Sequence, residues 1–432
     1  MGIVTDLQSR GLFQQVSDPD LDRKLAQIAS KRPIAAYAGF DPTADSLHVG
    51  NFVAILGLMY AQKHGLRPIA IVGGATGMIG DPSGKSSERI LQTKEAVATN
   101  ALGIRKVLER FLDFNHPTAP AKIVNNLDWF GAMSAIDFLR EVGSNFRIGS
   151  MLAKDSVRSR MQASEEGMSY TEFSYQLLQG YDYLKLYKEH ECVLQMGGSD
   201  QWGNITAGID LIRKMEGESG NAFGLTMPLI TTSSGAKFGK SEGNAVWLTA
   251  DKTKPFDFYQ FWLRTEDADV ARYLKLFTSL PLEEVDEIAQ QHAETPEKRM
   301  GQKRLAEEMT RMVHGAESAT QSGSASSTLY GAGVEALDAA AIEALISQGV
   351  AATDVPAAQL QAGLTVLDAT VATGLAKSRG EARRLVSQGG LYVNNVAMTD
   401  FNAVLTTADL VAGRAIVLRS GKKNYRLVRT GG

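Results

Sequence analysis

The sequence predicts an α/β protein whose first 230 or so residues form a doubly wound parallel sheet, followed by a small all-α domain and a C-terminal α+β module. Three observations support this division. Short apolar runs alternate with amphipathic helical patterns up to about residue 230, helical patterns fill 255–314, and strand-like runs return after residue 364. The length of 432 residues fits two or three domains, each large enough to bury its own core.

The first strand–helix–strand unit lies near the N-terminus. Residues 33–40 (PIAAYAGF) and 68–74 (PIAIVGG) are apolar runs that read as buried strands. Between them, residues 48–65 carry apolar side chains at helical spacing, and Gly65 can end the helix. A helix between two such strands predicts parallel strands joined by a right-handed crossover.

The same alternation continues with a helix near 93–112, strands at 121–126 and 192–198, and a helix after residue 204. Repeated units of this kind stack their helices on both faces of one sheet. The alternation therefore predicts a Rossmann-like domain over residues 1–230.

The remaining chain divides by composition. Residues 231–254 link the first domain to a helical domain at 255–320, where strand signals are few. The stretch 316–327 is almost all small and polar, which is typical of a flexible connector. We therefore place a connector at 321–363, before the final module at 364–432.

Overall composition excludes several classes of protein. Hydrophobic residues make up 44% and charged residues 22%, which is close to the average for globular proteins and unlike disordered or collagen-like chains. The longest apolar uncharged run, 68–80, has 13 residues and is too short to cross a bilayer. The single cysteine, Cys192, favours a reducing cytoplasm, so we expect a cytoplasmic protein without a membrane partner. His190 and Cys192 without a second pair make a poor zinc site, and no structural metal is expected.

The C-terminal module is basic although the whole chain is acidic. Residues 364–432 carry a net charge of +6, whereas the whole chain carries −3 and the preceding residues therefore −9. Ser378 can cap a helix on which Arg379 and Arg383 lie four residues apart. A solvated basic helix would show the same pattern. An RNA partner would contact Arg379, Arg383, Arg384, Lys422 and Lys423.

The segment 37–51, YAGFDPTADSLHVGN, leads from a strand through a loop into a helix. The N-terminus of a helix offers unpaired N–H groups to phosphates. Thr43 and His48 can add hydrogen bonds, and Gly50 lets a flat nucleotide approach the backbone. A strand-to-helix turn with a capping histidine is the alternative interpretation.

The segment 73–89, GGATGMIGDPSGKSSER, resembles a phosphate-binding P-loop only in part. A P-loop needs glycine at position 79, which is isoleucine, and Pro82 removes an N–H group. We expect instead a loop at the carboxyl end of a strand that presents Asp81, Lys85 and Arg89 to a ligand.

Two further segments carry polar groups suited to a substrate. Residues 237–244, KFGKSEGN, place Lys237 and Lys240 where they could stabilise a triphosphate in the transition state, although many such strings are solvated loops. Farther upstream, a helix face is predicted for Tyr175, Gln179 and Asp182, followed by Gln195, Asp200 and Gln201 near the end of a strand. An exposed amphipathic helix would explain the first three residues equally well.

HVGN near the start and KFGKS about 190 residues later resemble, in this order, the HIGH and KMSKS signatures of class I aminoacyl-tRNA synthetases. GFDPTADSLHVGN, GGATGMIGDPSGK, YTEFSYQLLQGYDYL and GGSDQWGNI are similar to the bacterial tyrosyl-tRNA synthetase family, and this resemblance covers essentially the whole chain. TGLAKSRGEARRLVSQGGLYVNN is similar to the S4 RNA-binding module of that family.

The resemblance implies a two-step reaction on a Rossmann-like catalytic domain. Tyrosine and ATP, accompanied by Mg²⁺, give tyrosyl-adenylate and pyrophosphate, and the tyrosyl group then passes to the 3′ end of tRNA-Tyr. Because the tyrosine carboxylate is already an anion, the first step needs positioning and charge stabilisation rather than a general base. The family also implies an anticodon-binding domain at 255–320, an S4-like domain at 364–432, and a homodimer with an interface around 130–165.

The resemblance also assigns roles to residues of this sequence. Those implied to stabilise the reacting phosphates are Thr43, His48, Lys85, Arg89, Lys237 and Lys240. Those implied to bind tyrosine are Asp81, Tyr175 and Gln179 at the ammonium, Tyr37 and Asp182 at the phenol, and Gln201 at the carboxyl. Those implied to bind ATP are Gly39, Asp41, His48, Gly50, Asn51, Gly198, Asp200 and Lys240.

The sequence departs from the family pattern at a few positions. Ala38 stands where some members carry cysteine, Asn51 replaces the second histidine of HIGH, and KFGKS differs from KMSKS at its second and third positions. Two alternatives stay open at this point. A tryptophanyl-tRNA synthetase shares both signatures, and an inactive RNA-binding relative could keep the fold.

Overall fold

The computed structural model of the chain describes residues 2–83, 92–162, 167–217, 220–235, 238–241, 244–331, 342–343, 345–346, 350–421 and 424–431. The chain forms two compact units. The first comprises Met1–Leu248 and Ala271–Glu287, and the second comprises Thr249–Val270 and Ile288–Gly432.

A six-stranded sheet with the order β1-β6-β5-β2-β3-β4 forms the centre of the first unit. The predicted strands are confirmed as β2 (Ala35–Phe40), β3 (Arg67–Val72), β4 (Lys122–Asn125) and β5 (Cys192–Gly198). They run parallel with β6 (Phe223–Met227), whereas the two-residue β1 (Gln15–Val16) pairs with β6 antiparallel. Because β1 is antiparallel to its neighbour, the sheet is mixed at one edge. Neither β1 nor β6 was predicted from the sequence.

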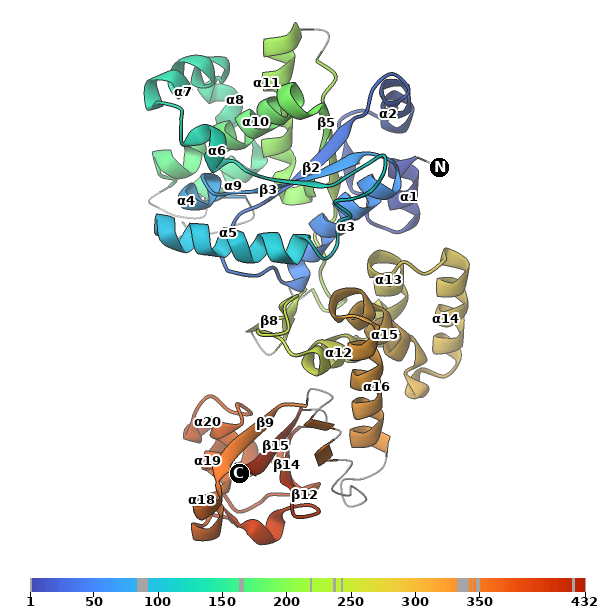
Figure 1. The fold of residues 1–432 in the computed structure, drawn as a ribbon, viewed down its shortest axis with the longest axis vertical. Helices are drawn as coiled ribbons and strands as arrows, with labels where there is room; N and C mark the ends of the chain where they lie inside the picture. The colour runs from blue at the N-terminus through green and yellow to red at the C-terminus, as the bar shows by residue number, and fades with distance from the viewer. Residues whose placement is uncertain are drawn as a thin grey trace. The chain divides into compact units, whose positions relative to one another are not determined.

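Helices cover both faces of this sheet. α3 (Phe52–Lys63) and α5 (Lys94–Leu108) lie on one face, and α10 (Tyr170–His190) and α11 (Trp202–Glu216) lie on the other (Figure 1). The crossovers change face between β2 and β5, which are neighbours in the sheet. In doubly wound sheets this switch point opens a crevice at the carboxyl ends of the strands.

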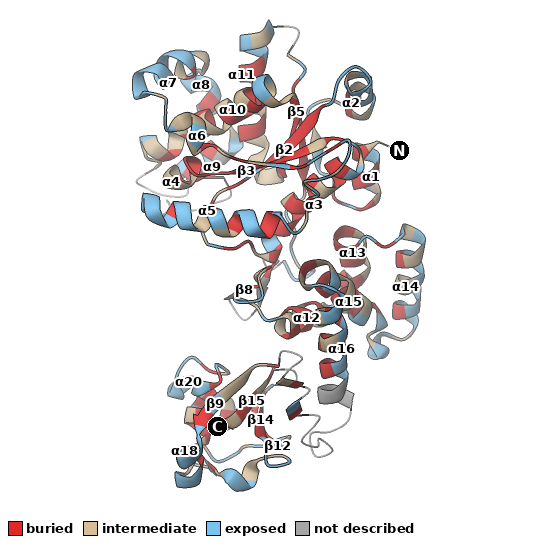
Figure 2. Ribbon diagram, viewed as in Figure 1, coloured by how far each residue is buried: buried red, intermediate tan, exposed pale blue. Residues whose placement is uncertain are grey.

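The remaining helices that lie wholly within the described part of the first unit are short. They are α1 (Ile3–Ser9), α2 (Leu21–Ala29), α4 (Thr76–Ile79), α6 (Leu127–Phe130), α7 (Ala135–Glu141), α8 (Ile148–Leu152) and α9 (Asp155–Gln162). The central strands are buried on both faces, as Figure 2 shows for β2 and β5. Continuous apolar runs rather than alternating ones are therefore the expected pattern for them.

The helical part of the second unit contains α12 (Pro255–Leu263), α15 (Met300–His314) and α16 (Ala316–Gly331). α13 (Asp267–Phe277) and α14 (Leu282–Glu294) each divide between the two units. The prediction of a flexible connector at 316–327 is wrong, because α16 spans this stretch and packs against α12 and α15. Its small side chains, among them the buried Ala319, Ser322 and Ala325, let the helices approach closely.

The C-terminal module is built on a five-stranded sheet of order β12-β11-β14-β15-β9. Its strands are β9 (Ala352–Pro356), β11 (Leu391–Val393), β12 (Val396–Ala397), β14 (Ala415–Ser420) and β15 (Asn424–Gly431). The prediction that 321–363 is a connector is wrong over its last part. There β9 pairs with β15, and α18 (Ala357–Ala362) follows β9. The module also contains α19 (Val366–Ala372) and α20 (Arg379–Ser387), with the short pair β10 (Leu364–Thr365) and β13 (Val404–Leu405).

No helix in the described part of the chain is both long enough and apolar enough to span a membrane.

Candidate active site

A cavity of about 520 Å³ opens at the carboxyl ends of β2 and β5, at the switch point of the sheet. It gathers residues that are far apart in the sequence. The predicted site residues that line it are Tyr37, Gly39, Asp41, Thr43, His48, Gly50, Asn51, Asp81, Tyr175, Gln179, Asp182, Gly198, Asp200 and Gln201. The predicted Lys85, Arg89 and Lys237 lie outside the described residues, and Lys240 begins the short strand β7 (Lys240–Ser241).

The helix N-terminus at one end of the cavity is capped by His48, the feature that the alternative interpretation of this segment expected. His48 Nδ1 accepts a hydrogen bond from the backbone N–H of Gly50 at 3.0 Å. Asn51 Oδ1 accepts one from the backbone N–H of His48 at 3.1 Å. A Cβ atom at Gly50 would lie 2.8 Å from the His48 ring, so this position has room only for glycine.

The KFGKS segment lies directly beside this helix N-terminus. Gly239 has a φ of +86°, and a Cβ atom there would lie 2.9 Å from the backbone nitrogen of Gly50. The Gly239 carbonyl accepts a hydrogen bond from Val246 N–H at 3.0 Å, and Val246 in turn accepts from Val49 N–H at 2.9 Å. The third position of KFGKS therefore requires glycine for both its backbone conformation and its close approach.

A network of amides surrounds the Asp81 carboxylate. Gln201 Nε2 donates to Asp81 Oδ2 at 2.6 Å, and Asn204 Nδ2 donates to Asp81 Oδ1 at 3.3 Å. Asn204 also donates to Gln179 Oε1 at 3.0 Å. Asn204 is not among the predicted site residues, although it lies three residues after Gln201 and its helical spacing from that residue could have indicated it.

Tyr175 and Asp41 are hydrogen-bonded to one another across the cavity. The Tyr175 hydroxyl donates to Asp41 Oδ2 at 2.8 Å, and Thr76 Oγ1 donates to Asp41 Oδ1 at 2.7 Å. Burial, together with the charges of Asp41 and Asp81, raises the pKa of Tyr175 well above its usual value. Tyr175 is therefore a neutral hydrogen-bonding group at physiological pH.

Asp182 is a buried carboxyl group at the opposite end of the cavity. Trp129 Nε1 donates to Asp182 Oδ1 at 2.9 Å, and Asn126 Nδ2 donates to Asp182 Oδ2 at 3.1 Å. Burial raises the pKa of Asp182 to about 8, although these two hydrogen bonds act in the opposite direction. Burial therefore favours the protonated form of Asp182 at neutral pH.

Tyr37 lies in the same part of the cavity and is almost completely buried, with 1% of its surface exposed. Among the described residues its hydroxyl has no hydrogen-bond partner. Buried polar groups are nearly always paired, so a lone hydroxyl in a cavity indicates a ligand that supplies the missing bond. Asn126 and Trp129 are not among the predicted site residues, because their contacts with Asp182 arise only from the fold.

Comparison with known families decides the assignment. Residues 29–331 match the family model for class I tRNA synthetases of the tryptophan and tyrosine group, and residues 346–428 match the model for the tyrosine–tRNA ligase SYY-like C-terminal domain. The chain is 49% identical to the tyrosine–tRNA ligase of Geobacillus kaustophilus and to tyrosine–tRNA ligase 1 of Bacillus anthracis, over 99% of this chain and 100% of each relative. The chain belongs to the class I aminoacyl-tRNA synthetases.

Solved structures agree with this synthetase family. The C-terminally truncated mitochondrial tyrosyl-tRNA synthetase of Coccidioides posadasii is 34% identical, with a TM-score of 0.64 over 75% of this chain and 91% of that one. The corresponding protein of Aspergillus nidulans is 32% identical, with a TM-score of 0.63 over 75% and 92%. The predicted α/β fold class is confirmed.

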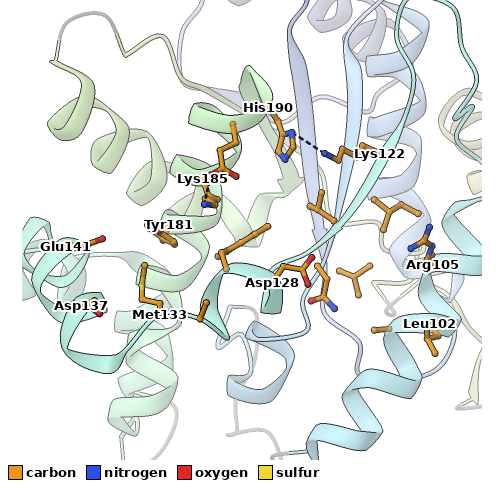
Figure 3. Close-up of a pocket in the computed structure, with 18 residues that line it drawn as sticks. Leu102, Arg105, Lys122, Asp128, Met133, Asp137, Glu141, Tyr181, Lys185 and His190 are labelled. Atoms are coloured by element: carbon orange, nitrogen blue, oxygen red, sulfur yellow. Dashed lines mark hydrogen bonds and ion pairs between the residues drawn. The ribbon is translucent and has the colours of Figure 1, made fainter.

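A second cavity of this synthetase, of about 890 Å³, lies between β4, α5, α6, α7 and α10 (Figure 3). It contains none of the predicted site residues. Several of its charged side chains have partners, for Lys185 pairs with Glu189, and Lys122 Nζ lies 3.4 Å from His190 Nδ1. Trp129 lines this cavity while its indole N–H reaches Asp182 in the first one.

The basic helix of the C-terminal module forms as predicted. Ser378 Oγ accepts a hydrogen bond from Glu381 N–H at 3.2 Å at the start of α20. Arg379 pairs with Asp368 at 3.2 Å, and the Arg383 guanidinium lies 4.3 Å from the centre of the Phe401 ring. Arg384 is exposed, and Lys422 and Lys423 lie outside the described residues.

Proposed function

We propose that this chain is a tyrosine–tRNA ligase. It activates tyrosine with ATP to form tyrosyl-adenylate and pyrophosphate, and then transfers the tyrosyl group to the 3′ end of tRNA-Tyr. The observation that carries this proposal is the pair formed by the buried Asp182 carboxyl and the unpartnered Tyr37 hydroxyl at one end of the cavity. A phenol hydroxyl both donates and accepts a hydrogen bond, so it can pair with both groups.

The same pair explains how the site selects its amino acid. Phenylalanine would leave the buried Tyr37 hydroxyl without a partner and would offer no hydrogen bond to Asp182 beyond those from Trp129 and Asn126. An unpaired buried hydroxyl costs on the order of 1–3 kcal/mol. The tryptophan indole offers a donor but no acceptor, so it cannot satisfy both groups either. Tyrosine is therefore favoured over the tryptophan alternative.

At the opposite end of the amino acid, Asp81, Gln179 and Tyr175 would bind the ammonium group. Asp81 and Gln179 offer acceptor oxygens, and the amide of Gln201 lies beside them to orient the carboxylate. This carboxylate oxygen attacks the α-phosphorus of ATP, the bond to the bridging oxygen breaks, and pyrophosphate leaves. Because the attacking group is already an anion, no side chain has to remove a proton.

The residues around the helix N-terminus would act on the phosphates. Thr43 and His48 line the cavity there, and Asp200 and Gly198 line it as well and would bind the ribose. We place Lys85, Arg89, Lys237 and Lys240 around the leaving pyrophosphate, where positive charge stabilises the transition state more than the bound substrate. Magnesium would enter with ATP and neutralise charge on its phosphates.

We also propose that the synthetase works as a homodimer. Large apolar side chains are exposed in and beside the predicted interface region 130–165: Ile136, Leu139, Ile148, Leu152, Met161 and Tyr170. Exposed apolar surface of this kind marks a protein interface. Light scattering should give the mass of a dimer, and Ile148→Asp should shift it towards the monomer, whereas Val396→Asp in the C-terminal module should not.

The basic C-terminal module and the helical domain would bind tRNA. The net charge of +6 on residues 364–432 and the exposed Arg384 support an RNA partner for this module. The buried free thiol of Cys192 fits a reducing cytoplasm.

The experiment that tests the function is ATP–pyrophosphate exchange with each amino acid in turn, without tRNA. Exchange with tyrosine alone supports the proposal, and charging of tRNA-Tyr completes it. Exchange with tryptophan would show that Tyr37 and Asp182 are assigned to the wrong substrate. RNA binding without exchange for any amino acid would favour the inactive relative.

A further inference from the structure

An aromatic cluster joins the KFGKS segment to helix α13. The Phe238 ring stacks on the Phe277 ring with centroids 5.1 Å apart and an angle of 15° between the planes. It also meets the edge of Tyr273, with centroids 5.0 Å apart. Tyr273 and Phe277 are almost completely buried, with 2% and 0% of their surfaces exposed. The ring of Phe238 is therefore packed against two buried side chains of α13.

The backbone next to Phe238 is held from the other side. Gly239 lies against the backbone of Gly50 and accepts the hydrogen bond from Val246 described above. Phe238 lines the cavity itself. In the sequence, Lys237 precedes Phe238 and Lys240 follows Gly239. The ring and the backbone together thus fix the chain between the two lysines.

The same helix also holds the chain upstream of the segment. The Tyr273 hydroxyl donates to the Thr231 carbonyl oxygen at 3.2 Å, and the Arg272 guanidinium donates to this oxygen as well. The guanidinium lies 5.0 Å from the centre of the Tyr273 ring. Thr231 and Phe238 both line the cavity, so one face of α13 supports the cavity wall at two points.

We propose that Phe238, Tyr273 and Phe277 are positioning residues for the activation step, because they hold the chain at Phe238 and Gly239, the two residues between Lys237 and Lys240 in the sequence. The inference rests on the proposed function of the site. Misplacing charged groups by about 1 Å can cost up to about a hundredfold in rate. Loss of the cluster should therefore lower the rate of adenylate formation while leaving tyrosine binding unchanged, since no cluster residue lies among the proposed tyrosine-binding groups.

A purely structural role for Phe238 predicts a different result. Removing this half-buried ring would then lower thermal stability without a selective effect on the chemical step. Methionine at position 238 separates the two roles. Its flexible thioether packs well against aromatic rings and should keep the contact with Tyr273 and Phe277 without a ring of its own. A matched control is Leu276 on the same helix, a buried side chain that lies beside Gly11 and is not part of the aromatic cluster.

The test uses the full-length chain and compares wild type with Phe238→Ala, Phe238→Met, Phe277→Leu and Leu276→Ala. The readouts are the single-turnover rate of tyrosyl-adenylate formation, equilibrium tyrosine binding without ATP, and Tm. We expect Phe238→Ala to be about tenfold to a hundredfold slower with unchanged tyrosine Kd. Phe277→Leu should be slowed in the same direction, Phe238→Met should recover most of the rate, and Leu276→Ala should lose Tm but not rate.

Several outcomes overturn the inference. One is a wild-type rate in Phe238→Ala, and another is a loss of rate in Leu276→Ala equal to that in Phe238→Ala. A slow Phe238→Met variant with wild-type Tm would also show that packing of residue 238 on Tyr273 and Phe277 does not set the rate. If the wild type forms no tyrosyl-adenylate, the proposed function fails first and the inference falls with it, so the two failures are distinguishable.

Discussion

At the residue scale, burial changes the pKa of the Asp182 carboxyl and thereby makes its contribution to stability depend on pH. Its pKa of about 8 compares with 3.8 for an exposed carboxyl. Between these two pH values the unfolded chain releases this proton while the native protein retains it. The native state then binds more protons, so the contribution of Asp182 to stability is greatest at low pH and falls as pH rises towards 8.

Replacing this carboxyl by an amide removes the titration. In the wild type, Asp182 should make the free energy of unfolding fall by up to about 1.4 kcal/mol per pH unit between pH 4 and pH 8. Asp182→Asn should lack this fall. Urea unfolding of both proteins at a series of pH values measures the difference. Asp354→Asn is the control, because the Arg429 partner lowers the pKa of this exposed carboxyl and its titration acts only below that range. Equal slopes in the wild type and Asp182→Asn would contradict the assigned pKa.

At the element scale, helix α10 could be predicted from spacing, whereas α16 could not. Tyr175, Gln179 and Asp182 recur at helical intervals, and all three line the cavity. Asn126 and Trp129 reach Asp182 only because β4 and α6 are placed beside α10, which no local pattern records. The helix α16 was missed because small polar residues favour loops, and only its packing against α12 and α15 overrides this preference.

The packing of α16 leads to a stability prediction. Ser322 is fully buried on this helix, whereas Ser327 is exposed. Ser322→Leu should lower the free energy of unfolding by about 1–3 kcal/mol, because the added methylene and methyl groups have no space. Ser327→Leu should change it by less than about 0.5 kcal/mol. Thermal unfolding compares the two variants, and an equal effect would show that α16 is not packed as described.

At the scale of the whole molecule, charge is distributed unevenly along the chain. Residues 364–432 carry +6 while the preceding residues carry −9. An acidic body repels the phosphates of RNA, so the electrostatic part of tRNA binding must come from local basic surfaces rather than from the net charge. This division fits the two roles proposed for the chain, because amino-acid activation requires no RNA and transfer does.

The proposed role of the basic C-terminal module can be tested through the salt dependence of tRNA binding. Each phosphate contact that is lost should reduce the slope of log K against log salt concentration by about 1. Arg384→Gln removes an exposed cation from α20. It should weaken tRNA binding most at low salt and reduce this slope by about 1. Arg105→Gln on α5 of the first unit is the matched control, and ATP–pyrophosphate exchange shows that the active site of each variant is intact. A slope unchanged in Arg384→Gln would mean that α20 does not contact the RNA backbone, and the basic charge of the module would then need another role.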